Sequence, residues 1–160
     1  MIDLLEAAEN RMRGILQGKQ YPAASGVTLP LEVYLVEIPP KRDDPLHPEV
    51  IPYCLITVGD GSGGPLMPRS ELFAVQFVFH AVHLDGRPDK MAGIGYISET
   101  HAMMEAFCTP FELGDWELVA VSDGKMFEKF YGADGEFLGP NYSVQYIFRA
   151  VKRANNCEVF

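Results

Sequence analysis

A glycine-rich stretch with one serine is the first place in this sequence where chemistry could occur. Residues 59–66 read GDGSGGPL, one inserted glycine away from the GDSGGPL that surrounds the nucleophile of chymotrypsin-like serine proteases. In that motif the serine follows the aspartate directly, so that the turn aligns its hydroxyl with the N–H groups of the oxyanion hole. Here Gly61 separates Asp60 from Ser62. The one histidine before the serine, His47, lies in a proline-rich segment, and we therefore predict no protease nucleophile.

The same glycines have the spacing of a phosphate-binding loop but not its context. Gly59, Gly61 and Gly64 match GxGxxG. A dinucleotide site needs this loop to lead into a helix whose N-terminus receives the pyrophosphate, whereas Pro65, Pro68 and a strand-like run follow here. The lysine and the hydroxyl residue of a Walker A motif are also missing. The pattern favours a flexible loop between two strands, with no nucleotide cofactor.

Histidines give the next candidates, for a metal site. His80 and His83 form HxxH, but residues three apart on a strand point to opposite faces, so this pair cannot easily hold one ion. His101 falls on the next predicted helix and could approach one of them. A small α+β enzyme or ligand-binding domain that uses these histidines is therefore kept as an alternative, although we expect no metal and no cofactor.

The whole chain has the size and composition of one acidic domain. Of its 160 residues, 48% are hydrophobic and 22% charged, as in ordinary globular proteins. Because 22 acidic residues face 13 basic ones, the net charge of −9 disfavours non-specific attraction to a phosphate backbone or an anionic bilayer. The N-terminus lacks the features of a signal peptide, and no apolar run approaches the roughly 20 residues of a membrane span.

The three cysteines indicate a protein kept in reducing, cytoplasm-like conditions. Cys54, Cys108 and Cys157 cannot all pair within one chain, and none has CxxC spacing. Cys108 falls at a predicted helix end, where a thiol is not activated as it is near a helix N-terminus. We expect free, unreactive thiols in cytoplasm-like conditions.

Apolar periodicity predicts the elements. Helical spacing indicates a helix over the first 17 residues, ended by Gly18, and a second helix that follows Ser98 as N-cap and ends near residue 107. Alternating or β-branched runs predict strands over 31–38, 53–58, 71–83, 116–124 and 141–151. Residues 39–52 favour an exposed loop, 125–140 remain open between strand and loop, and 152–160 indicate a flexible tail. The order α-β-β-β-α-β-β predicts a single α+β domain over 1–160, with a mostly antiparallel sheet packed with two helices.

Period-two patterns assign faces to the strands. The side chains expected to meet the core are Phe73, Val75, Phe77, Phe79 and Ala81 on one strand and Tyr142, Val144, Tyr146, Phe148 and Ala150 on another. The strand 53–58 is apolar enough to predict burial on both faces. Because 71–83 exceeds the usual strand length, we expect its far end to project beyond the domain.

The segments together resemble a known family. In order, MIDLLEA, IPYCLITVGDG, ELFAVQFVFHAV, SETHAMMEAF and NYSVQYIFRAV are similar to the tail terminator and tail-completion proteins of long-tailed bacteriophages. The similarity lies in the order of the elements and in their residue patterns. It covers most of the chain and contains no catalytic motif. The loops at 39–52 and 125–140 depart from the shortest members of the family.

This resemblance implies a non-enzymatic virion protein. Such a subunit forms a hexameric ring at the head-proximal end of the tail, stops polymerisation of the tail tube and provides the surface for joining the head. Its partners would be copies of itself, the tail tube protein, head-tail connector or neck proteins, and DNA that passes through the lumen without specific binding. It would be assembled in the cytoplasm of the bacterial host. A head-tail connector or stopper is the alternative within the same class.

Under this interpretation the functional residues are contacts and not catalysts. Three of them flank the glycine-rich loop and three occupy the turn after the long strand. The contact candidates are Asp60, Ser62, Arg69, Asp85, Arg87 and Lys90. Each is equally consistent with an ordinary exposed polar residue.

Overall fold

Two long antiparallel strands form the centre of the structure. This computed structural model describes residues 2–59, 62–64, 67–80, 90–134 and 141–153. β6 (Met67–His80) and β10 (Asn141–Lys152) pair from His80 opposite Asn141 to Ser70 opposite Val151. One face of each strand is buried, with Phe73, Val75, Phe77 and Phe79 on β6 and Tyr142, Val144, Tyr146, Phe148 and Ala150 on β10. The predicted faces are therefore confirmed over the described residues; Ala81 lies outside them.

The other strands extend this pair into a curled, mostly antiparallel sheet. Its order is β3-β4-β6-β10-β8-β7, with β5 beside β6 and β9 beside β10. The bounds are β3 Glu32–Leu35, β4 Tyr53–Val58, β5 Ser62–Gly64, β7 Glu112–Leu113, β8 Trp116–Val119 and β9 Phe127–Asp134. Only β3 and β4 run parallel among the described pairs. A separate two-stranded hairpin joins β1 (Gln20–Pro22) to β2 (Thr28–Pro30).

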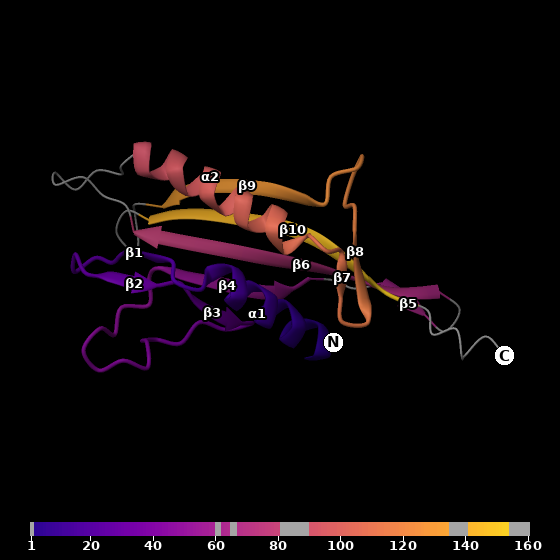
Figure 1. Cartoon of the computed structure of the whole chain (residues 1–160), viewed down its shortest axis with the longest axis horizontal. Coiled ribbons are helices and arrows are strands. Elements are labelled where there is room, and N and C mark those ends of the chain that lie inside the picture. The colour runs from indigo at the N-terminus through magenta and orange to yellow at the C-terminus, as the bar shows by residue number, and fades with distance from the viewer. Residues whose placement is uncertain (1, 60–61, 65–66, 81–89, 135–140, 154–160) are drawn as a thin grey trace.

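Both helices pack on the same face of the sheet (Figure 1). α1 (Ile2–Leu16) buries Leu4, Ala8, Met12 and Leu16, and α2 (Lys90–Phe107) buries Met103, Met104 and Phe107. Gly18, with φ of 79°, follows the end of α1 as the sequence predicts. The Arg11 guanidinium of α1 donates to the backbone oxygens of Phe107 and Pro110 at distances of 2.9 and 2.7 Å, which fixes the end of α2 against α1.

The predicted α+β class and the order of the seven main elements are confirmed. Among the described residues the structure adds five further strands to that order, β1, β2, β5, β7 and β9. β9 resolves part of the segment 125–140, for which the sequence favours neither strand nor loop, since it pairs with β10 from Phe127 opposite Phe148 to Asp134 opposite Asn141. The glycine-rich stretch, predicted as a loop, contributes β5 and thereby forms a hairpin with β6.

Several element boundaries differ from the prediction. α2 begins at Lys90, so that Ser98 is an interior residue of the helix and not its N-cap. The sequence LDGRPDKMAG, residues 84–93, predicts a turn, whereas Lys90 to Gly93 already belong to the helix. β3 ends at Leu35, before the predicted Ile38, because Val36 adopts a φ of 68° that breaks the extended backbone.

The prediction that β4 is buried on both faces is wrong. Cys54 and Ile56 are fully buried under α1, but Tyr53, Leu55 and Thr57 on the opposite face are only half-buried. The two described helices pack on the first face alone, so the second face has no helix above it.

The long strand projects at its start. Figure 1 shows β5 and the beginning of β6 extending past β7 and β8 along the long axis of the molecule. Residues 81–83, where the sequence predicts a projecting end, lie outside the described residues.

Candidate interaction surfaces

The structure brings two of the six predicted contact residues together. Ser62 in β5 and Arg69 in β6 belong to one hairpin, in which Ser62 lies opposite Ser70 and Gly64 opposite Met67. Lys90 begins α2 near the other end of β6, where the Tyr96 hydroxyl of α2 lies 3.5 Å from the His80 carbonyl. The remaining candidates, Asp60, Asp85 and Arg87, lie outside the described residues.

The base of the hairpin is held by charged and polar contacts. Arg69 Nε lies 2.9 Å from Oε1 of Glu71, whose side chain is 5% exposed while that of Arg69 is 57% exposed. The Arg149 guanidinium donates to the Ser70 hydroxyl at 2.7 Å, which joins this end of β6 to β10. The hairpin therefore leaves the sheet from an ordered base and presents part of a guanidinium to its surroundings.

An acidic knob lies in the loop between β3 and β4. We use this name for residues 43–46, which are Asp43, Asp44, Pro45 and Leu46. Leu46 is 82% exposed, far above a typical leucine. The Asp44 carboxylate accepts a hydrogen bond from the Leu46 backbone N–H at 3.0 Å, so the backbone that carries this leucine has a defined turn.

A buried arginine organises the loop behind the knob. Arg42 is 7% exposed, and its guanidinium donates to the backbone oxygens of Glu49 at 2.6 Å, of Val50 at 3.4 Å and of Pro52. Its backbone N–H also donates to the Pro48 carbonyl at 2.9 Å. The sequence KRDD balances two positive and two negative charges, but the structure turns one of the cations inward, which leaves the outer part of the loop acidic.

A lysine-rimmed cleft lies at the opposite edge of the sheet, between the second half of α2 and β9. It has a volume of about 650 Å³ and is lined by His101, Glu105 and residues 125–130. Met126 and Phe127 are partly buried against the core, whereas Phe130 is 53% exposed. Because residues from both faces of β9 line it, the cleft reaches around this edge strand.

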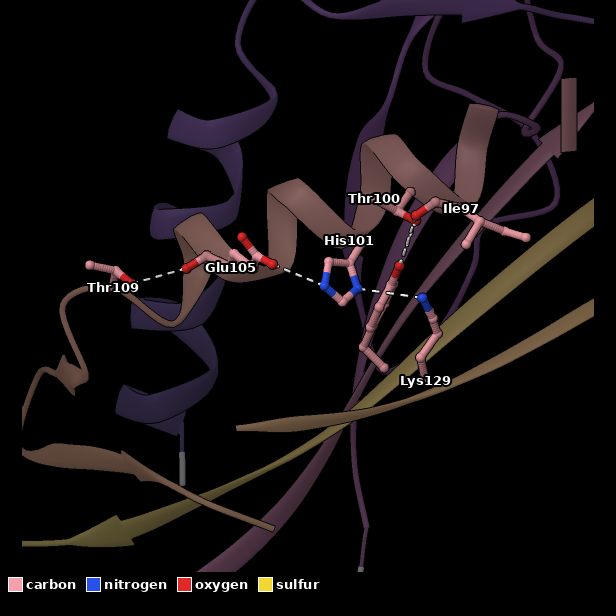
Figure 2. Close-up of polar contacts among 7 residues, drawn as sticks. Ile97, Thr100, His101, Glu105, Thr109 and Lys129 are labelled. Carbon is pink, nitrogen blue, oxygen red and sulfur yellow. Dashed lines mark hydrogen bonds and ion pairs between the residues drawn. The ribbon is translucent and has the colours of Figure 1, made fainter. Parts of the chain in front are cut away.

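The charges in the cleft are arranged about one histidine, as Figure 2 shows. His101 Nε2 lies 2.9 Å from Glu105 Oε1, and the Lys129 ammonium lies 3.4 Å from His101 Nδ1. A neutral ring protonated on Nε2 satisfies both contacts, donating to the carboxylate and accepting from the lysine. The Glu128 carboxylate accepts from the Ser122 hydroxyl at 3.1 Å. Both carboxylates of the cleft thus have a hydrogen-bond donor.

Buried hydroxyls join α2 to β10. The Thr100 and Tyr146 hydroxyls lie 2.7 Å apart, and Thr100 also donates to the Tyr96 carbonyl at 2.7 Å. Burial raises the pKa of Tyr146, and the hydrogen bond with Thr100 partly opposes that shift. Phe127 packs edge-on against both Tyr146 and His101. The position of β9 under α2 is therefore fixed by packing from several sides.

The histidines proposed as a metal group line different cavities. His80 contributes to a cavity of about 550 Å³ with Lys41, Glu49 and Asn141, whereas His101 belongs to the lysine-rimmed cleft. His83 lies outside the described residues. Over the part of the chain that the structure describes, no group of three or more histidine, cysteine and carboxylate side chains is close enough to hold a metal ion.

The described thiols are free and poorly suited to nucleophilic chemistry. Burial raises the pKa of Cys54 far above its ordinary value and that of Cys108 to about 11, the latter against a smaller opposite effect of Arg11. A thiol is nucleophilic as the thiolate, so both are unreactive near neutral pH. In the described ranges no helix is both long enough and apolar enough to span a membrane.

Sequence reasoning misses the two surfaces that stand out in the structure. The knob is part of a segment predicted only as an exposed loop, and its one signal is a leucine placed between two aspartates and a proline-rich run. The cleft depends on β9 and α2 meeting in space, so only His101 is a candidate by residue type, and for a different purpose. Neither surface includes one of the six predicted contacts.

Comparison with known proteins gives distant likenesses in fold among solved structures. A chain from the virion of a native gene transfer agent (GTA) particle is similar to this chain with 15% sequence identity and a TM-score of 0.40, over 91% of this chain and 94% of that one. No family model and no curated protein matches.

Proposed function

We propose that this chain is a tail-terminator subunit, which forms a hexameric ring at the head-proximal end of a phage-like tail, ends the tail tube and provides the surface for head joining. The proposal rests on the resemblance in element order and on the free edges of the sheet. It assigns the protein a structural role in a virion, without catalysis, and gives it further copies of itself, the tail tube protein and neck proteins as partners.

The observation that carries the proposal is a pair of edge strands on opposite sides of one sheet, whose outer sides carry no further strand within the described residues. Among the described strands β3 pairs only with β4, and β9 only with β10. Each edge has exposed apolar side chains near it, Val36, Ile38 and Leu46 after β3 and Phe130 and Tyr131 on β9. Exposed edges and apolar groups promote association, and a closed ring of identical copies covers them.

The projecting hairpin suits the second task of a terminator, which is contact with a neighbouring ring. Ser62 and Arg69 lie on it, and Asp60 belongs to the same segment of the sequence. A hairpin that extends beyond the sheet is able to reach a partner without disturbing the subunit contacts at β3 and β9. Asp85 and Arg87, which lie outside the described residues, and Lys90 at the start of α2 are also proposed as partner contacts.

Loss of the protein from its own particle tests this function directly. If the chain ends the tail tube, particles that lack it carry abnormally long tails in electron micrographs. Normal tails that remain unattached to heads would support a connector or stopper instead, and unchanged particles would contradict both roles. The mass of the purified chain, alone and with isolated tail tubes, is measured in parallel; a ring of copies is expected in at least one of these two conditions.

A further inference from the structure

We propose that the acidic knob of one copy inserts into the lysine-rimmed cleft of the next copy, and that this contact joins neighbouring subunits. The inference rests on the proposed ring, and it names the surfaces that would form the ring contact. Its chemistry is that of an apolar side chain flanked by carboxylates entering an apolar cleft flanked by ammonium groups.

The knob has the properties of an interface anchor. Leu46 is the most exposed of the large hydrophobic side chains in the described residues, at 82%, and Asp43 beside it is also exposed. The Asp44 hydrogen bond and the buried Arg42 hold the surrounding backbone in place before any partner arrives. A preorganised anchor loses little conformational entropy on binding, which favours affinity.

The cleft offers the complementary groups. Met126, Phe127 and Phe130 supply apolar surface, and its volume of about 650 Å³ falls in the range of roughly 300–1,000 Å³ that is typical of binding pockets. Lys125 and Lys129 supply two positive charges, and Glu105 and Glu128, which accept hydrogen bonds from His101 and Ser122, supply two negative ones. The attraction for the knob carboxylates therefore comes from the two ammonium groups and not from a net charge of the cleft. Two copies that each carry a net charge of −9 repel each other at long range, and locally opposite charges across a contact help to offset this repulsion.

The two surfaces cannot meet within one chain. The knob follows β3 at one edge of the sheet, the cleft lies at β9 on the other edge, and β4, β6 and β10 separate them. Four strand spacings of about 4.8 Å place these edges roughly 19 Å apart. The contact is therefore made between copies, and in the proposed ring it is head-to-tail, with each copy giving its knob to one neighbour and its cleft to the other.

A pair of half-blocked variants of the full chain tests the contact. One variant, Asp43→Ser/Leu46→Ser, damages the knob and keeps Asp44 and Arg42; the other, Lys125→Ser/Lys129→Ser, damages the cleft. A control, Lys19→Ser/Lys152→Ser, removes the same charge as the cleft variant from other places. Circular dichroism and thermal melting confirm that each variant is folded, and sedimentation and native mass spectrometry measure assembly in solution and with isolated tail tubes.

We expect each half-blocked variant to remain a monomer under conditions where the wild type and the control assemble, with self-association weakened at least about 100-fold. Mixed in equal amounts, the two variants should form a one-to-one pair and stop, since the intact knob of one fits the intact cleft of the other. If both variants assemble into the same rings as the wild type, or if they do not pair with each other on mixing, the proposed contact is wrong. Neither result contradicts the ring itself. A wild-type chain that stays monomeric in every condition overturns the ring and the contact together.

Discussion

Gly93 lies where α2 crosses β9 and β10, and its lack of a side chain allows the helix to approach the sheet. A Cβ built at this position would lie 2.6 Å from the Tyr131 hydroxyl oxygen and 2.6 Å from Cε1 of Tyr142, closer than side chains tolerate. These two rings stack on each other with centroids 5.7 Å apart, so neither moves away without disturbing the other.

Alanine substitutions at the two helical glycines should therefore have opposite effects. We expect Gly93→Ala to lower the free energy of unfolding by about 1–3 kcal/mol, because the clash exceeds the gain in helix propensity. Gly95→Ala, where nothing lies within 4 Å of the new Cβ, should raise it by roughly 0.5–1 kcal/mol. Urea unfolding followed by circular dichroism measures both, and a stabilised Gly93→Ala variant would contradict the packing described for α2.

Cys108 makes stability depend on pH in the alkaline range. Burial raises the pKa of its thiol to about 11 in the folded protein, whereas the unfolded chain loses this proton near pH 9. Between these values the unfolded state binds fewer protons, so the free energy of unfolding falls as pH rises, by roughly 2.5 kcal/mol in all. Urea unfolding at a series of pH values from 8 to 11 should show a smaller decline in a Cys108→Ala variant than in the wild type. Equal slopes would show that the buried thiol makes no such contribution.

At the scale of elements, the loop between β3 and β4 depends on Arg42 more than on any regular hydrogen-bonded ladder. Arg42→Ala removes the donor from the carbonyls of Glu49, Val50 and Pro52. We expect faster amide hydrogen exchange across residues 41–52 and little change in β6 and β10, because the sheet does not need this loop. Lys41→Ala is the matched control. Unchanged exchange in the loop would mean that other contacts hold the knob in place.

The elements that the sequence predicts well are those whose own side chains decide their structure. β6 and β10 alternate so regularly that the pattern alone assigns Phe77 and Tyr146 to the core face, where both are fully buried. The predicted start of α2 is too late because Ser98 is a residue type that often caps a helix. The need for glycine at position 93 comes from two tyrosines that are distant in the sequence and pack against the helix there, so it cannot be recognised from the local sequence. The residues of β9 do not decide between strand and loop by themselves, because pairing with β10 makes this segment a strand.

The candidate surfaces are less accessible to sequence reasoning than the fold. Burial of Arg42 turns an apparently balanced KRDD into an acidic surface, and this depends on carbonyls that only the folded loop brings together. The cleft likewise needs α2 and β9 side by side. For the hairpin, the glycine-rich stretch resembles protease and phosphate-binding motifs by residue type, whereas in the structure Ser62 lies opposite Ser70 in a pair of strands.

At the scale of the whole molecule, the net charge of −9 bears on the DNA that the proposed ring would surround. An acidic protein releases few counterions on meeting a phosphate backbone, so we expect no measurable binding of double-stranded DNA to the full chain at about 50 mM salt, monomeric or assembled. Fluorescence anisotropy with a labelled duplex measures this, with a basic DNA-binding protein as the positive control. Binding that weakens steeply with added salt would reveal a positively charged lumen and contradict the expectation.

The hairpin at the start of β6 gives the molecule a direction. Rotation about a ring axis repeats every copy in the same orientation, so the 14-residue β6 of each copy in the proposed ring would carry its hairpin toward the same rim. Such a ring has two unlike rims and is not interchangeable with its own inverted form. Only one rim would fit a given tube end. The orientation of the ring on the tube would then depend on which end of β6 extends past the neighbouring strands.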